Sequence, residues 1–535
     1  MLVIGITTLW VLSVIKGIPI REIRVVGVWL LLYAIGLSQS EVMMHIGVLG
    51  GLYNRDNVIS NVEGYIYILS MILMIGYIRG LGLGMRSDPE GKRSGSGPKD
   101  LRTSGQSPSP LGMGPTGKLP EEENADTMFA KSKDSPLGND SNKEERGEGW
   151  EMEVEVVLLS VMGMVLLVWS YDLISTYLAI ELQSLALYMI TSRSEEGMGA
   201  ISGIKYYILG ILSSSILLMG IVLMYQGTGT THNEGIRMIL ETKEMRVVEI
   251  GGYLMISGIL FKLALPPFHN WAPDVYEGVV TRITSWIAVM GKVSYLFYIY
   301  NVRIYNMGIL EGIIVGALVI GSVMGLTQNR VKRLLAYSTI NQMGFILMGL
   351  LTVGVISRVS FIFYNVQYWL TLVNSFCILI ALGGRYDIRY ISSLYRESPV
   401  LLITLVINIY SLIGIPPLIG FFGKQMVISS SLLGGYVGLV TVAIITSVIS
   451  GGYYLRVITT GCIERPSPRL SSVIQGDNQR LSSDVEGHAE DDSGSDRNNE
   501  GCPIPLSWVI STITLITILY SIRPRMVTIP IILMT

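Results

Sequence analysis

Residues 261–296 read FKLALPPFHNWAPDVYEGVVTRITSWIAVMGKVSYL, and they decide how the chain folds. The stretch is mostly apolar, yet it contains two lysines, Lys262 and Lys292, and a proline pair, Pro266–Pro267. Proline removes intrahelical hydrogen bonds, and a charged side chain is costly in lipid. The stretch therefore predicts a broken membrane helix with functional lysines beside and after the break.

The whole chain has 535 residues, of which 50% are hydrophobic and 15% charged, with a mean hydropathy of +0.50. This composition excludes an ordinary soluble domain. Almost half of the charges lie in two polar segments, 84–153 and 463–503, which we interpret as disordered insertions rather than regulatory or docking segments. The net charge of −2 provides no basic field, which excludes nucleic acid as a partner.

Long apolar runs indicate an all-α, polytopic membrane protein, because a helix that crosses a bilayer needs about 20 apolar residues. A modest excess of Lys and Arg in the loops after odd-numbered runs predicts that both termini lie outside and both polar segments inside. The run at 399–433 contains Pro416–Pro417, which predicts a second broken helix. About fourteen runs are present, at 2–18, 23–37, 62–83, 154–171, 173–192, 201–225, 249–265 with a continuation to about 280, 283–302, 308–327, 334–355, 359–383, 399–433, 434–459 and 504–522.

Five ionisable residues lie inside these runs: Glu181, Lys205, Lys262, Lys292 and Lys424. Lys205 is close to the start of its run, so a side chain that reaches the membrane interface is as good an interpretation as a functional one. Burial disfavours the charged form of lysine, whereas a nearby glutamate favours it. A glutamate and a lysine on different helices thus predict a proton-carrying switch, with a static buried ion pair as the alternative.

The two proline pairs lie 150 residues apart, about five runs, and each stands beside a buried lysine. Five-helix repeats begin on opposite sides of the membrane, so this spacing favours two inverted repeats over two unrelated kinks. His269 follows the first pair. Because imidazole titrates near neutral pH, His269 suits a proton relay, although a hydrogen-bonded core histidine is an equal alternative.

Sequence motifs for cofactors are absent. The chain has no GxGxxG after a strand, no Walker A sequence, no HExxH and no GxSxG, and its three cysteines include no CxxC. We therefore expect it to bind no NADH, flavin, nucleotide triphosphate, iron–sulfur cluster or catalytic metal by itself.

The opening stretch, together with KYYILGILSSSILLMGI at 205–221 and GIPPLIGFFGK at 414–424, resembles the antiporter-like membrane subunits of respiratory complex I. Within that family the chain is most similar to the chain 2 group, and HIGVLGGLYNRDNVISNVEGYIYIL at 45–69 resembles its fungal mitochondrial members. The resemblance covers roughly residues 1–83 and 154–460 and leaves out both polar insertions. It implies fourteen membrane helices with two inverted five-helix repeats, each containing one broken helix.

The resemblance also implies residue roles. Glu181 matches the family's glutamate that pairs with the lysine of the first broken helix, here Lys262. Lys292 matches the central lysine and Lys424 the distal lysine on the second broken helix, while Lys205 and His269 fall on further family positions. Opening and closing of the Glu181–Lys262 pair would then drive a proton through Lys292 to Lys424.

The implied context is the proton-pumping NADH:ubiquinone oxidoreductase of the mitochondrial inner membrane, in which NADH, FMN, iron–sulfur clusters and ubiquinone are used by other subunits. The implied partners are membrane-arm subunits, especially the antiporter-like chain 4 and small chains, and lipids such as cardiolipin. A stand-alone cation/proton antiporter and a non-pumping scaffold are the alternatives. The chain then divides into helices one to three (1–83), an insertion (84–153), two repeats (154–302 and 303–462), a second insertion (463–503) and a last helix with its tail (504–535).

Overall fold

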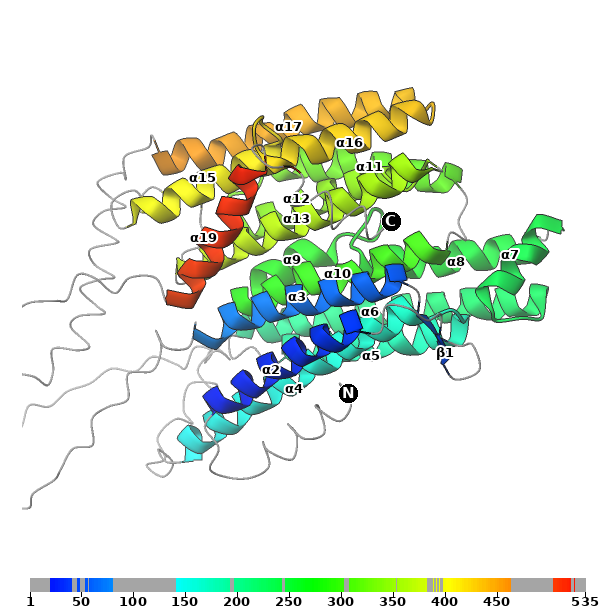
Figure 1. Ribbon diagram of the computed structural model, residues 1–535, viewed down its shortest axis with the longest axis horizontal. Coiled ribbons are helices and arrows are strands. Elements are labelled where there is room, and N and C mark those ends of the chain that lie inside the picture. The colour runs from blue at the N-terminus through cyan, green and yellow to red at the C-terminus, as the bar shows by residue number, and fades with distance from the viewer. Residues whose placement is uncertain are drawn as a thin grey trace, which may run out of the picture.

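The computed structural model describes residues 20–40, 46–48, 53–55, 57–79, 141–192, 197–242, 246–302, 307–352, 354–382, 388, 391, 394, 398–462, 504–520 and 524. Within these ranges the long helices lie side by side and form one elongated bundle (Figure 1). The predicted first span at 2–18 and the predicted insertion at 463–503 lie outside the described residues, as does most of the insertion at 84–153.

The described chain is almost entirely helical, which confirms the predicted fold class at that level. In chain order the helices are α2 (Ile20–Ser40), α3 (Asn57–Arg79), α4 (Ser141–Trp169), α5 (Leu173–Ser192), α6 (Gly197–Thr228), α7 (Asn233–Thr242), α8 (Arg246–Lys262), α9 (Trp271–Gly278), α10 (Thr281–Val302), α11 (Met307–Leu326), α12 (Val331–Met348), α13 (Val355–Ala381), α15 (Pro399–Ile413), α16 (Ile419–Leu433), α17 (Val437–Cys462) and α19 (Ile504–Leu519).

The bounds of most helices follow the apolar runs to within a few residues, because apolar length decides where a helix can lie in lipid. By length and composition, four helices in the described part of the chain are able to cross a membrane without a break. These are Leu173–Ser192, Gly199–Thr228, Gly308–Leu326 and Val437–Cys462. Other apolar helices are shorter, among them the two halves of the run at 399–433.

Three local features differ from the sequence expectations. α4 begins at Ser141, so the end of the insertion at 84–153 is helical rather than disordered. The sequence SNKE at 141–144 has the S-x-x-E pattern of a helix start, and the glutamates that follow favour helix. A short helix, α7, lies between α6 and α8, where the sequence predicted a loop. Two three-residue strands, β1 (Ile46–Val48) and β2 (Tyr53–Arg55), pair antiparallel.

Several pairs of adjacent helices approach closely at a glycine, and two of these contacts have the same spacing along the chain. A Cβ on Gly163 of α4 would lie 2.7 Å from the backbone nitrogen of Gln183 on α5. A Cβ on Gly321 of α11 would lie 2.6 Å from the backbone nitrogen of Asn341 on α12. Both contacts join residues that are 20 positions apart in the chain, and small residues at such crossings are what close helix packing requires.

α10 lies at the centre of the bundle. It packs against α3, α4 and α5 and, through Phe297 and Tyr300, against Phe361 of α13. Almost all of its side chains are buried. α10 therefore joins the part of the bundle that contains α4–α9 to the part that contains α11–α17 (Figure 1).

Candidate functional site

The first helix break separates α8 from α9 at Pro266–Pro267. α8 ends at Lys262, and Ala264 then adopts a left-handed conformation with φ of 57°. The N–H of Leu265 donates to the carbonyl of Leu260 at 3.0 Å, which closes the last turn of the helix. This helix-ending motif usually has glycine at the left-handed position, so alanine there is strained.

A tryptophan from α9 satisfies one of the carbonyls at this break. Trp271 Nε1 donates to the oxygen of Phe261 at 2.9 Å, and the Trp271 ring stacks on Tyr206 with ring centres 4.7 Å apart. The same carbonyl also accepts from the N–H of Ala264 at 2.9 Å, so it has two donors at the break. Trp271 therefore holds the end of α8, and with it the neighbouring Lys262, against α9 and α6.

Lys262 is 4% exposed and is held by neutral hydroxyl groups. Its Nζ donates to Ser184 Oγ at 2.9 Å and to Tyr188 OH at 2.9 Å, both on α5, and to Ser214 Oγ on α6 at 3.3 Å. The Nζ also lies 5.4 Å from the centre of the Tyr188 ring. A hydroxyl can accept a hydrogen bond from an ammonium or donate one to a neutral amine, so this pocket fits both forms of the lysine.

Glu181 lies on the same face of α5 as Ser184 and Tyr188 but does not contact Lys262. Positions 181, 184 and 188 are spaced at three and four residues, which places them on one face of the helix. Among the described residues no carboxylate lies within ion-pair distance of Lys262, and Glu181 Oε1 has no hydrogen-bond partner. The predicted ion pair between Glu181 and Lys262 is thus not formed in this structure, where Ser184 Oγ and Tyr188 OH both lie 2.9 Å from the lysine.

Lys292 is the most deeply buried of the predicted lysines, at 1% exposed in the middle of α10. Within the described part of the chain its Nζ has no hydrogen-bond partner, and it lies 5.6 Å from the centre of the Tyr276 ring. Gln183 of α5 packs beside it, accepting from Ser294 at 2.9 Å and donating to the Gly291 carbonyl at 3.4 Å. Lys292 is therefore a buried amine that lies over an aromatic ring and has no hydrogen-bond partner among the described residues.

The second break separates α15 from α16 at Pro416–Pro417, and Lys424 is tied directly to it. Gly414 is left-handed with φ of 90°, and Lys424 Nζ donates to the carbonyl of Ile413, the last residue of α15, at 2.8 Å. Lys424 is 7% exposed and lies 5.2 Å from the centre of the Phe345 ring. At this break the lysine itself satisfies the freed carbonyl.

The remaining two predicted residues lie apart from these three lysines. Lys205 is 52% exposed and pairs with Asp274 of α9 at 2.6 Å, so it is neither buried nor unpaired. His269 is half-buried between α8 and α9, and its Nδ1 has no hydrogen-bond partner among the described residues. No hydrogen bond between His269 and a lysine is present in that part of the chain.

Several contacting residues were missed by the sequence reasoning. Ser184, Tyr188 and Ser214 hold Lys262, but hydroxyl residues are common in membrane helices and carry no signal that marks them. A surface charge cluster on α6, α9 and α12 was also missed, although Asp274 and Glu277 stand within the quoted motif. Its members are Lys205, Asp274, Glu277, Arg330 and Arg333.

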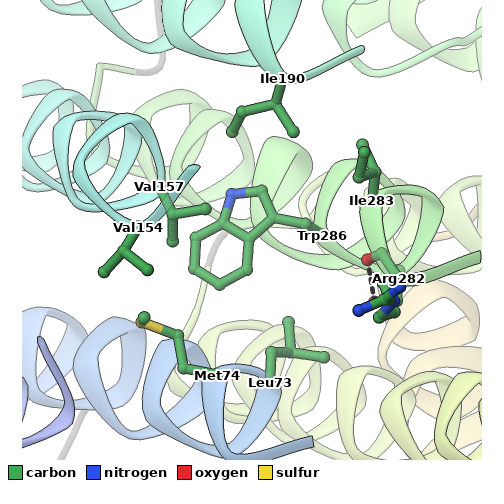
Figure 2. Close-up of a pocket in the computed structure, with 9 residues that line it drawn as sticks. Leu73, Met74, Val154, Val157, Ile190, Arg282, Ile283 and Trp286 are labelled. Carbon is green, nitrogen blue, oxygen red and sulfur yellow. Dashed lines mark hydrogen bonds between the residues drawn. The ribbon is translucent and has the colours of Figure 1, made fainter. Parts of the chain in front are cut away.

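A pocket lies away from the lysines, where α3, α4, α5 and α10 meet (Figure 2). Trp286 occupies its centre, with Leu73 and Met74 of α3 on one side and Val157 of α4 on another, and Arg282 lies at the edge. Trp286 Nε1 donates to Ser160 Oγ at 3.1 Å. The lining is mostly apolar, with Arg282 and Ser285 as its polar members. Within the described ranges no group of three His, Cys, Asp or Glu residues is placed to hold a metal ion.

Comparison with known proteins identifies relatives over the full length of the chain. The model of the family described as NADH:quinone oxidoreductase/Mrp antiporter, TM, matches residues 170–450. The chain is 33% identical over 555 residues to NADH-ubiquinone oxidoreductase chain 2 of Rhizopus oryzae, which covers 96% of both chains.

Solved structures show the same fold. A chain of respiratory complex I from Thermus thermophilus with bound aureothin superposes with a TM-score of 0.70 at 21% identity, over 98% of this chain and 97% of that one. A chain of the Mrp complex from Dietzia sp. superposes with a TM-score of 0.73 at 17% identity, over 100% and 95%. Because one relative matches along 96% of the chain and the family model spans both helix breaks, the chain belongs to the NADH-ubiquinone oxidoreductase chain 2 family of antiporter-like membrane subunits.

Proposed function

We propose that this chain translocates protons through a path that includes Lys262, Lys292 and Lys424, as a membrane subunit of an NADH:ubiquinone oxidoreductase complex. The observation that carries the proposal is the burial of three lysines without a neutralising carboxylate among the described residues. A permanently charged lysine in such a position is costly. Reversible protonation of these lysines during proton transfer would explain why they occupy the interior.

Buried polar atoms without a hydrogen-bond partner support a hydrated path. Among the described residues, the Tyr276 hydroxyl, the Asn341 amide, Gln367 Oε1 and the Ser411 hydroxyl are buried without a hydrogen-bond partner. They lie on α9, α12, α13 and α15; α12 contacts both α9 and α13, and α15 contacts α13. Buried polar groups need partners, and water supplies them where protein does not. Water held by these groups would connect the lysines for proton transfer.

Glu181 is proposed to act as the switch on Lys262. A carboxylate that approaches Lys262 favours its protonated form, and withdrawal of the carboxylate favours proton release. In this proposal the described arrangement would be the separated state, because Lys262 donates to hydroxyls and Glu181 Oε1 has no hydrogen-bond partner among the described residues. In this scheme Lys205 and His269 lie beside the path and are not required to carry the proton from Lys262 to Lys292.

The two breaks support the proposal of two inverted repeats at 154–302 and 303–462 within a fourteen-helix chain. Ala264 and Gly414 are both left-handed, and each stands two residues before its proline pair. The glycine crossings of α4 with α5 and of α11 with α12 use the same chain separation. Five spans per repeat place equivalent elements on opposite sides of the membrane.

The cellular context is proposed from the family. The fungal relative is named an NADH-ubiquinone oxidoreductase chain 2, which supports the mitochondrial inner membrane as location and membrane-arm subunits, including a chain 4, as neighbours. The catalysed reaction would be that of the whole complex, with NADH, FMN, iron–sulfur clusters and ubiquinone bound by other subunits. Anionic lipids such as cardiolipin would surround the exposed apolar faces.

The experiment is to introduce Lys262→Met and to measure protons translocated per NADH oxidised by the assembled complex in sealed vesicles. We expect the ratio to fall while the amount of assembled complex is maintained. Unchanged proton translocation per NADH would exclude a pumping role for Lys262, whereas loss of assembled complex with a normal ratio in what remains would favour the scaffold alternative.

A stand-alone cation/proton antiporter is the second candidate, because the chain shares its fold with a chain of the Mrp complex. In that case the purified chain in vesicles would exchange Na⁺ or K⁺ for protons without NADH or quinone. Co-migration of the chain with a large NADH-oxidising assembly in mild detergent would contradict it.

A further inference from the structure

Five charged side chains, on α6, on α9 and at the start of α12, form a cluster of ion pairs. We call this cluster the charge clamp. Lys205 of α6 pairs with Asp274 of α9 at 2.6 Å. Arg333 of α12 reaches Glu277 of α9 at 3.1 Å and Asp274 at 3.6 Å. Arg330, the residue just before α12, pairs with Glu277 as well. α9 is therefore held between α6 on one side and the start of α12 on the other.

A buried lysine strengthens the contact between α9 and α12. Lys332, 3% exposed, donates from its Nζ to the carbonyl of Val279 at 2.8 Å, and Val279 is the C-terminal cap of α9. A cation at this position interacts favourably with the C-terminal end of a helix. Single surface ion pairs contribute little, but linked pairs supported by a buried charge form a network that holds its geometry.

The opposite end of α9 contacts the residue next to Lys262. α9 is only eight residues long, and Trp271, Asp274 and Glu277 are spaced at three residues along it. Trp271 binds the Phe261 carbonyl next to Lys262 and stacks on Tyr206. The Tyr206 ring in turn lies against the ring of Tyr188, 4.8 Å between centres, and Tyr188 accepts from Lys262. A displacement of α9 at the clamp would thus change the support of Lys262.

α12 is connected to Lys424 in a similarly indirect way, through the residue that precedes the partner of Lys424. Gln342, about three turns from the clamp, donates from its Nε2 to the carbonyl of Leu412 at 3.3 Å. Leu412 precedes Ile413, whose carbonyl binds Lys424. α12 therefore contacts the clamp near its first turn and the second break in its middle.

We propose that Glu277 and Arg333 are positioning residues that couple the two lysine sites by fixing α9 against α12. The inference rests on the proposed proton path. It assigns these surface residues a role in pumping even though neither contacts a lysine of the path. The ion pairs set the position of a short rigid helix whose other end supports Lys262, and the same contact sets the position of α12 beside the second break.

The test uses Glu277→Gln and Arg333→Gln in the assembled complex, with Arg333→Lys as the conservative variant and Lys262→Met as the reference. Arg246→Gln is the matched control, since Arg246 is an exposed arginine at the start of α8 without an ion pair among the described residues. The measurements are assembled complex per milligram of membrane protein, NADH oxidation, and protons translocated per NADH.

We expect the two glutamine variants to lower protons per NADH by about twofold or more, as coupling mutations do, with the conservative variant retaining most of the ratio and the control all of it. A lower yield of complex with an unchanged ratio would mean that the clamp only stabilises the fold, which overturns the inference. If Lys262→Met lowers the ratio and the clamp variants do not, the coupling role is wrong and the proton path stands. If Lys262→Met also leaves the ratio unchanged, the proposed function fails first.

Discussion

Gly414→Ala perturbs the second lysine site through a single methyl group. Gly414 has φ of 90° and ψ of 47°, and a Cβ built on it would lie 3.0 Å from Lys424 Cδ. The left-handed backbone alone costs a residue with a side chain roughly 1–2 kcal/mol. The methyl group also forces the lysine stem to move, which threatens the hydrogen bond from Lys424 Nζ to Ile413. A hydrogen bond from a charged group contributes about 1.5–3 kcal/mol.

The cost of the left-handed backbone and the effect of the contact with Lys424 can be separated with a second glycine of similar conformation. Gly435, at the turn between α16 and α17, has φ of 85°, and a Cβ on it would meet nothing within 4 Å. Gly435→Ala therefore carries the backbone cost without the contact with Lys424. We expect both variants to lower the thermal midpoint of the assembled complex, and Gly414→Ala alone to lower protons translocated per NADH. Equal effects of the two variants on the proton ratio would refute the argument that Gly414 keeps space for Lys424.

Three further predictions follow from the same geometry. Ala264→Gly removes a left-handed alanine and should stabilise the first break by about 1 kcal/mol, measured as a higher thermal midpoint with pumping retained. Tyr188→Phe removes one hydroxyl acceptor of Lys262 and should lower protons per NADH more than it lowers NADH oxidation; an unchanged ratio would show that Ser184 and Ser214 suffice. Gly163→Ala should reduce assembly of the complex, because its Cβ would press on the backbone of α5, whereas Gly36→Ala, which meets nothing within 4 Å, should not.

Apolar length and proline placement were sufficient to predict most helices of this chain. α5 occupies the predicted residues 173–192, and both proline pairs interrupt a helix. These features depend on local chemistry: a run of apolar side chains and a missing N–H group. The helical start of α4 at Ser141 was overlooked because the charge-rich composition of the segment outweighed a capping pattern four residues long.

Contacts between helices were harder to predict. The sequence places Glu181, Ser184 and Tyr188 on one helix face, but it does not say which of them reaches Lys262. That choice depends on rotamers and on the exact crossing of α5 with α8. The partners of Lys205 were likewise invisible, since Asp274 lies 69 residues away and its proximity depends on the tertiary fold.

The three buried lysines differ in what can stabilise their ammonium form, and this difference suggests where a proton rests. Lys262 has three hydroxyl acceptors and Lys424 has a backbone carbonyl, whereas Lys292 lies over the Tyr276 ring and has no acceptor among the described residues. A cation over a ring is held more weakly than one with several hydrogen bonds. The charged state of Lys292 therefore has the fewest hydrogen-bond partners of the three. If protons follow the proposed path, we expect them to rest at either helix break and only to pass the central lysine. At Lys424 the break itself provides the acceptor, because the interrupted helix exposes the Ile413 carbonyl, whereas the acceptors of Lys262 are side chains of α5 and α6 that lie beside the break.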